Sequence, residues 1–143
     1  MSDASPSNCP DCRPLGDVCE IENLQDEPGV QNFPEAAKKL RPPNELLERS
    51  PGSREKLLKC FTCGAWFEWS MRIPGGSEDV FRTWIMESLR RLTPKQARAA
   101  LESEVLDEKK SARYGPESVK RAERFAEGAN RARAELERSE TAR

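Results

Sequence analysis

The sequence predicts an α+β fold, in which a small ribbon of about three short antiparallel strands precedes a helical hairpin and a C-terminal helix. Two Cys-x-x-Cys motifs, at residues 9–12 and 60–63, are flanked by short stretches that favour strands. Beyond residue 74, apolar residues recur at spacings of three and four, as on one face of a helix. These two patterns place a strand-rich part first and a helical part second.

The two motifs predict a tetrahedral metal site with Cys9, Cys12, Cys60 and Cys63 as ligands. Zinc is the expected ion, because it prefers thiolates and the chain contains no histidine. When the protein fills all four positions, neither water nor substrate can bind the metal. We therefore expect one structural Zn²⁺, whose binding energy adds to the folding of a small core.

Two other uses of these cysteines remain open from spacing alone. Iron in the same sulfur cage, as in rubredoxin, would make the protein an electron carrier. A thioredoxin-like redox pair is less compatible, since the second motif is followed by an aromatic stretch suited to a strand, where the redox pair would begin a helix. The fifth cysteine, Cys19, is interpreted first as a small buried residue and second as a replacement ligand.

Composition divides the 143 residues into four parts. Residues 1–8 are expected to be disordered, and residues 9–73 form the ribbon with a long inserted loop at 25–54. Residues 74–106 form a helical hairpin packed on the ribbon, and residues 107–143 form a charged C-terminal helix or tail. Such an insertion is tolerated because loop-closure entropy grows only logarithmically with length.

Three strands are expected, at Val18–Leu24, Lys56–Lys59 and Ala65–Ile73. In the third, alternation divides the side chains between two faces: Trp66, Glu68 and Ser70 on one, and Phe67, Trp69 and Met71 on the other. The proline-rich insertion allows at most two short helices, Pro34–Leu40 and Pro43–Arg49, and is expected to lie on the surface.

The first long helix is predicted at Glu78–Leu92, with Ser77 as its N-cap. Thr93 and Gln96 form a capping box, and proline at the first helical position begins a second helix that runs to about Leu106. After a break at residues 114–116, a third helix of about twenty residues carries a thin, alanine-rich apolar stripe that Gly128 interrupts.

Charge and hydropathy exclude several classes of protein. Charged residues make up 34% of the chain and its net charge is −1, so no strong attraction to nucleic acid or membranes is expected. No apolar run is long enough to span a bilayer, and the N-terminus lacks the basic and apolar regions of a secretory signal. We expect a soluble, cytoplasmic protein, a compartment in which thiols stay reduced.

A further pattern resembles known proteins. The stretch Leu57-Leu58-Lys59-Cys60-x-x-Cys63-Gly64, an aromatic strand, Gly75-Gly76-Ser77-Glu78-Asp79 and Arg91-Leu92-Thr93-Pro94 are similar to small, mostly uncharacterised bacterial zinc-ribbon proteins with two Cys-x-x-Cys motifs. The resemblance covers residues 9–12 and about 55–100. It implies a zinc ribbon with a short helical extension, and it carries over the four paired cysteines as ligands without implying an activity.

The sequence favours binding over catalysis. It has no histidine for general-base work, no glycine-rich phosphate loop and no nucleophile motif. The leading hypothesis is a non-enzymatic adaptor that recognises another protein, and the alternative is a nucleic-acid-associated ribbon, such as a transcription accessory factor. The candidate binding surface comprises Trp66, Trp69, Arg82, Arg90, Arg91, Lys95 and Arg98. For the two Trp residues, core packing is the first interpretation and binding the second. No small-molecule substrate is expected.

Overall fold

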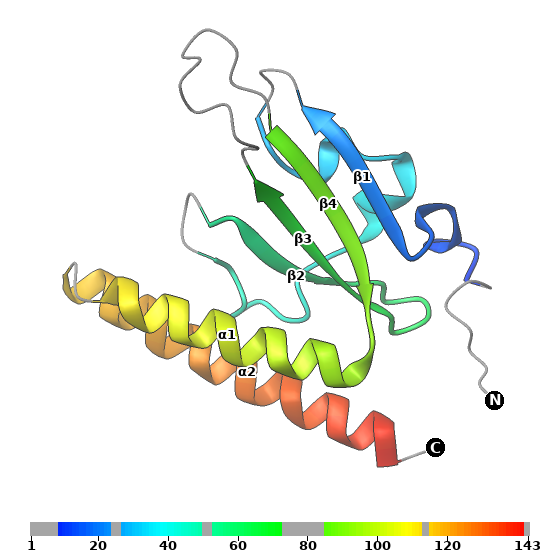
Figure 1. Ribbon diagram of the computed structural model, residues 1–143. Helices are drawn as coiled ribbons and strands as arrows, with labels where there is room; N and C mark the ends of the chain where they lie inside the picture. Colours follow the sequence, from blue (N-terminus) through cyan, green and yellow to red (C-terminus); the bar gives the residue numbers. More distant parts are fainter. Residues whose placement is uncertain (1–8, 24–26, 50–52, 73–84, 113–114, 142–143) are drawn as a thin grey trace, which may run out of the picture. The chain divides into compact units, whose positions relative to one another are not determined.

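The computed structural model describes residues 9–23, 27–49, 53–72, 85–112 and 115–141. These residues form an α+β fold, a four-stranded antiparallel sheet followed by a hairpin of two helices (Figure 1). They divide into two units, residues 1–41 with 54–91 and residues 42–53 with 92–143. Helices long and apolar enough to cross a membrane are not found among them.

The sheet of the first unit has the strand order β1-β4-β3-β2. Its strands are β1 (Val18–Asn23), β2 (Glu55–Lys59), β3 (Trp66–Arg72) and β4 (Ile85–Leu92). β1 pairs with β4 in a register that sets Cys19 opposite Leu89, and β2 pairs with β3 with Leu58 opposite Phe67. The three predicted strands are confirmed, and β4 is a fourth that lies between β1 and β3.

The prediction of a helix at Glu78–Leu92 is wrong for residues 85–92, which form β4. Its first part, with the predicted N-cap Ser77 and residues Arg82 and Trp84, lies outside the described residues, as does the predicted disorder of residues 1–8. The error has a physical origin. β4 directs Glu87 and Arg91 to the core side of the sheet. Its sequence therefore lacks the alternating apolar and polar residues by which a strand is usually recognised.

The core of the first unit lies on one face of its sheet. It contains Leu58, Phe67, Trp69 and Leu89 from the strands, Cys9, Cys12 and Cys60 from the two motifs, and Leu15, Phe33, Ala37 and Leu40 from the connecting segments. Phe67 and Ala37 have no exposed surface. The insertion is therefore partly a core element and not only a surface loop, contrary to expectation.

A short 3-10 helix replaces one of the two helices predicted in the insertion. The first unit contains η2 (Arg13–Leu15), η3 (Val30–Asn32) and η4 (Glu35–Lys39), and η4 lies where the sequence predicts Pro34–Leu40. The predicted helix Pro43–Arg49 is wrong, because that segment forms only a turn around residues 45–46.

The second unit is built on α1 (Pro94–Ser111) and α2 (Pro116–Thr141), which pack side by side as a hairpin (Figure 1). The predicted capping box is confirmed: the backbone N–H of Gln96 donates to Thr93 Oγ1 over 3.2 Å, and that of Thr93 donates to Gln96 Oε1 over 2.8 Å. The predicted third helix is in fact the second helix of this hairpin, and the described residues contain no third α-helix.

The alanine-rich stripe of α2 is buried from Ala122 to Leu136, whereas Val119 at its beginning is exposed. Its buried members are Ala122, Phe125, Ala129, Ala132 and Leu136. Arg49, from the insertion, is also buried in this unit, and its guanidinium pairs with Glu104 at 3.3 Å and Glu108 at 2.9 Å. Small side chains on α2 thus leave space for a segment that comes from a distant part of the chain.

Candidate metal centre

The first Cys-x-x-Cys motif lies directly before η2. The backbone N–H of Arg13 donates to the carbonyl oxygen of Cys9 over 2.9 Å and closes a tight turn between the two cysteines. The N–H of Leu15 donates to the carbonyl of Cys12 over 3.0 Å and continues the turn into η2. Both cysteine side chains therefore project from one side of a short, hydrogen-bonded loop.

The second motif connects β2 to β3. The N–H of Gly64 donates to the carbonyl of Cys60 over 2.8 Å, and the N–H of Cys60 donates to the carbonyl of Ala65 over 2.9 Å. Gly64 has φ = 81°, in the left-handed region that glycine adopts without steric cost. This is the turn that the motif Cys-x-x-Cys-Gly predicts.

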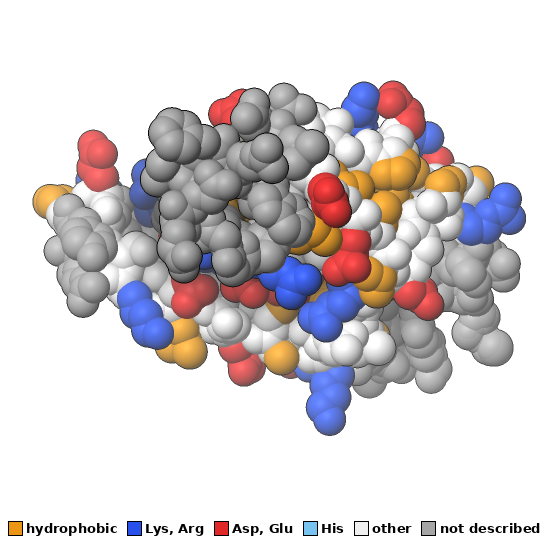
Figure 2. Space-filling view, turned by 45° about the horizontal axis from the view of Figure 1, so that its top comes forward, with side chains coloured by type: hydrophobic (Ala, Val, Ile, Leu, Met, Phe, Trp, Pro, Cys, Tyr) orange, Lys and Arg blue, Asp and Glu red, His pale blue; other side chains and the backbone are white. Residues whose placement is uncertain are grey.

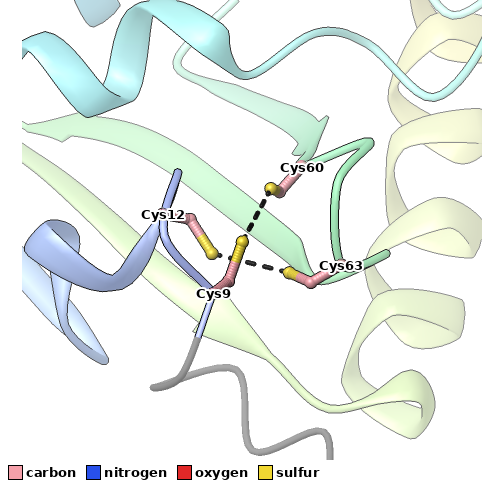
Figure 3. A group of neighbouring side chains, drawn as sticks. All are labelled: Cys9, Cys12, Cys60 and Cys63. Atoms are coloured by element: carbon pink, nitrogen blue, oxygen red, sulfur yellow. Dashed lines mark hydrogen bonds between the residues drawn. The ribbon is translucent and has the colours of Figure 1, made fainter.

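The two motifs bring four sulfur atoms together. All four Sγ atoms lie within 4.8 Å of one another, with 3.8 Å between Cys9 and Cys60 and 3.5 Å between Cys12 and Cys63 (Figure 3). Zn–S bonds of about 2.3 Å place the sulfurs of a regular tetrahedron about 3.8 Å apart. A disulfide requires about 2.05 Å, and all five cysteines are free thiols. The cluster therefore has the spacing of a metal cage.

Burial separates the cluster from water. Cys12, Cys60 and Cys9 are 0%, 3% and 6% exposed, and Cys63 is partly buried. All four belong to the first unit, where three of them are part of its apolar core. A bound metal would thus lie against the core, with the protein supplying every ligand.

The thiol groups differ in their electrostatics. Burial raises the pKa of Cys9, but hydrogen bonds from the backbone of Cys12 and Asp11 and from the thiols of Cys63 and Cys12 together lower it to about 7. Burial dominates at Cys12 and Cys63 and raises the pKa of both. Four thiolates cannot be held together here without a cation, because each one repels the others. A bound metal ion would supply the positive charge that allows all four thiols to deprotonate.

A polar contact outside the cluster joins the two motifs. Asp11, inside the first motif, accepts a hydrogen bond from the hydroxyl of Thr62, which is inside the second. Its other oxygen pairs with the Lys39 ammonium at 3.1 Å. The Thr62 hydrogen bond, followed by Lys39, lowers the pKa of Asp11, so the carboxylate is ionised at neutral pH. This contact fixes the two loops relative to each other.

The structure distributes the other candidate residues differently from the surface proposed for them. Trp66 and Trp69 are 4% and 3% exposed, and Trp69 belongs to the apolar core. Arg90 is half exposed and pairs with Glu68 at 3.3 Å. Arg91 is directed toward the cysteine cluster.

The remaining candidates lie elsewhere. Lys95 and Arg98 lie on α1 in the second unit, and Arg82 lies outside the described residues. Cys19 lies on β1, partly buried against the core, and does not belong to the four-sulfur group found among the described residues.

Sequence reasoning missed Glu87 and assigned Arg91 to a binding surface and not to the cysteine cluster, because it placed both residues on a helix. Glu87 is fully buried. The Nη1 atom of Arg91 lies 3.6 Å from Cys12 Sγ and donates to it. One signal was available in the sequence: Pro14 follows Cys12 at the position where Ala65 follows Cys63, and proline has no N–H.

Charged side chains of both signs lie next to one another on the face drawn in Figure 2. Among the large apolar side chains of the described residues, those that remain exposed are Val18, Phe61, Leu106 and Val119. Phe61 is 58% exposed and lies between the two cysteines of the second motif. Comparison with protein-family models, with curated proteins and with solved structures found no match. The four-cysteine cluster is thus the feature from which function must be argued.

Proposed function

We propose that Cys9, Cys12, Cys60 and Cys63 hold one structural zinc ion, and that the protein is a non-enzymatic, cytoplasmic adaptor of the zinc-ribbon type that binds another protein. The observation that carries the zinc proposal is the sulfur cage itself, with its near-tetrahedral spacing and four buried or partly buried thiols. Because no ligand position is left for water or substrate, the metal supports the fold and does no chemistry.

Metal content tests this proposal directly. The protein is purified without added metal and analysed by elemental mass spectrometry and visible absorbance. We expect one zinc per chain and no colour, and a Cys60→Ser variant that loses the metal. One iron per chain with visible absorption would replace the zinc proposal by an electron carrier. Absence of metal from wild-type protein, also after incubation with Zn²⁺, would contradict both.

The adaptor proposal is supported by Phe61. Its ring is exposed at the tip of the second motif, and the Lys59 ammonium lies 5.1 Å from the ring centroid. Exposed aromatic side chains on rigid loops are typical anchors of protein interfaces. A metal-fixed loop would present this ring with little loss of conformational entropy on binding.

Quantitative affinity capture with three forms of the full chain tests the adaptor proposal. We expect at least one protein that wild type and Val119→Ala enrich equally and that Phe61→Ala loses. Val119 is also an exposed apolar residue, so its replacement controls for nonspecific binding through apolar surface. If no captured protein depends on Phe61, this surface is not the interface.

The nucleic-acid hypothesis is separated from the adaptor by a titration with labelled single- and double-stranded oligonucleotides. Phosphate contacts by Lys and Arg produce an affinity that falls steeply with salt. Affinity that falls with salt and is weakened by Arg90→Ala would favour the alternative. No binding at low salt would exclude it.

A further inference from the structure

The two Cys-x-x-Cys motifs differ in the residues that follow their second cysteine. After Cys63, Gly64 adopts the left-handed conformation of a turn in which backbone N–H groups point toward sulfur, and the next residue, Ala65, carries such an N–H. After Cys12, Arg13 begins η2 and Pro14 occupies the position that corresponds to Ala65. Since proline has no N–H, the first motif cannot supply the backbone donor that the second supplies.

Arg91 brings a donor to the same sulfur from β4. Its Nη1 donates to Cys12 Sγ at 3.6 Å, while its Nη2 donates to the carbonyl oxygen of Gly16 at 3.3 Å. Its Nε lies 3.4 Å from a carboxylate oxygen of Asp17. The Arg91 side chain is only 9% exposed, whereas the Asp17 side chain is 91% exposed.

Packing holds the guanidinium in this position. The group lies over the ring of Phe67, 4.7 Å from its centroid, and Phe67 is fully buried. The backbone N–H of Arg91 also donates to the carbonyl of Asp17 over 2.8 Å, which ties β4 to the loop after the first motif. The cation is thus fixed beside Cys12 by partners on three sides.

We propose that Arg91 is a positioning residue of the metal centre, which donates to the Cys12 thiolate in place of the N–H that Pro14 lacks and offsets the negative charge of the four-thiolate site. The inference rests on the proposed metal-binding function. Groups outside the ligand shell that hydrogen-bond to ligands contribute to metal affinity, and their removal typically costs 10–100-fold. Arg91 therefore stabilises one ligand selectively, whereas a general packing role would affect all four.

Co²⁺ is the probe for this proposal, because its thiolate complexes absorb in the visible and near ultraviolet. Full-length wild type, Arg91→Met and Arg91→Lys are titrated with Co²⁺ alone and against a competing chelator. Arg90→Met is the control, since its neighbouring side chain is half exposed and pairs with Glu68. We expect Arg91→Met to bind about tenfold more weakly, with a shifted sulfur-to-metal band. Arg91→Lys should be intermediate and Arg90→Met unchanged.

Alkylation of the Co²⁺-loaded proteins, mapped by mass spectrometry, supplies a second readout. Loss of the Arg91 hydrogen bond should make Cys12 the first cysteine modified in Arg91→Met, because a thiolate that accepts fewer hydrogen bonds is more nucleophilic. Equal acceleration at all four cysteines would indicate a structural role and overturn the proposal. Unchanged affinity and spectrum in Arg91→Met would also overturn it.

If Arg91→Met does not fold, Arg91→Lys decides. The sulfur-to-Co²⁺ absorption band of Arg91→Lys must then shift from its wild-type position, as expected for a weaker hydrogen bond to the Cys12 sulfur. An unchanged band overturns the proposal. If the wild-type protein binds neither Co²⁺ nor Zn²⁺, the proposed metal-binding function itself is refuted. If wild type binds metal and no Arg91 variant alters that binding, only the role of Arg91 is refuted.

Discussion

Glu87 is a fully buried carboxylate whose two oxygens accept four hydrogen bonds. The donors are Asn23 Nδ2 at 2.7 Å, the Gly29 N–H at 2.8 Å, Asn32 Nδ2 at 2.9 Å and Trp69 Nε1 at 2.9 Å. They come from β1, from β3 and from the segment around η3. The carboxylate thus joins the sheet to part of the insertion, which explains how a charge can occupy the core side of β4.

Replacement of Glu87 by glutamine should destabilise the protein by about 2–3 kcal/mol, although it preserves the size of the side chain. The amide NH₂ would face two N–H donors, whichever way it turns, and would leave buried donors without an acceptor. Urea denaturation of Glu87→Gln, with exposed Glu20→Gln on β1 as control, measures the effect. Equal midpoints for the two variants would show that these hydrogen bonds contribute little.

The raised pKa of Glu68 predicts that the free energy of unfolding depends on pH. Burial raises its pKa, the nearby Glu55 raises it further, and Arg90 partly opposes both. The folded protein therefore holds this proton more tightly than the unfolded chain, where the pKa is about 4.3. Above the raised pKa of the folded state, the buried carboxylate of Glu68 is ionised and lowers the free energy of unfolding. This destabilisation disappears as the pH falls to about 4.3, the pKa of the unfolded chain.

Stability curves of wild type and Glu68→Gln between pH 4 and pH 8 test this sign. The free energy of unfolding of Glu68→Gln, relative to wild type, should be largest at pH 8 and should decrease as the pH is lowered. The metal site titrates in both proteins, so its contribution cancels in the difference. A difference that grows toward low pH would mean that the Arg90 ion pair outweighs burial.

At the scale of elements, the sequence was informative wherever structure is determined locally. The Cys-x-x-Cys turns, the strand from Trp66 and the capping box at Thr93 each depend on residues close together in the chain. β4 could not be recognised in this way. Ile85, Leu89 and Leu92 fit a helical period, while the partners that allow Glu87 and Arg91 on the core side of a strand come from remote segments.

The grouping of the four cysteines was predictable, but their surroundings were not. Spacing alone pairs Cys9 with Cys12 and Cys60 with Cys63, because chelation by a tight turn needs two intervening residues. The contact of Asp11 with Thr62 and the donation from Arg91 depend on how the loops meet in three dimensions. The burial of Trp66 and Trp69 agrees with core packing, which the sequence favoured over a binding role for them.

Gly128 shows that a residue which weakens a helix can be required by packing. A β carbon at this position would lie 2.7 Å from Leu46 Cβ and 2.9 Å from Asn44 Oδ1, both in the segment that crosses α2. The side-chain amide of Asn44 also donates to the carbonyl of Gly128 over 3.0 Å. The glycine that appeared to interrupt the apolar stripe instead allows the insertion to contact the helix backbone.

We therefore expect Gly128→Ala to destabilise the protein by about 1–3 kcal/mol, the usual cost of overpacking. On intrinsic helix propensity alone, the same change would stabilise α2 by about 1 kcal/mol. The two effects have opposite signs, so thermal denaturation separates them, with exposed Glu123→Ala on the same helix as a reference for propensity. A gain in stability would show that the Asn44–Leu46 segment moves away at little cost.

At the scale of the whole molecule, the candidate metal site belongs to only one of the two units. All four cysteines lie in the first unit, and three are part of its apolar core, whereas the second unit is a helical hairpin with its own buried stripe. The binding energy of a structural metal becomes folding energy for the part of the chain that forms the site. Removal of the metal should therefore affect the two units unequally.

Hydrogen exchange of wild type before and after treatment with a chelator tests this prediction. We expect β1, β2, β3 and β4 to lose protection, because without the metal the thiols must be reprotonated and the two motifs are no longer joined through sulfur. The amides of α1 and α2 should keep most of their protection, since that hairpin buries apolar side chains without metal. Cys12→Ser and Cys60→Ser should reproduce the pattern without chelator, and Cys19→Ser should not. Equal loss of protection in both units would show that the hairpin folds only with the metal-bound sheet, and no loss in either would show that the sulfur cage does not contribute to stability.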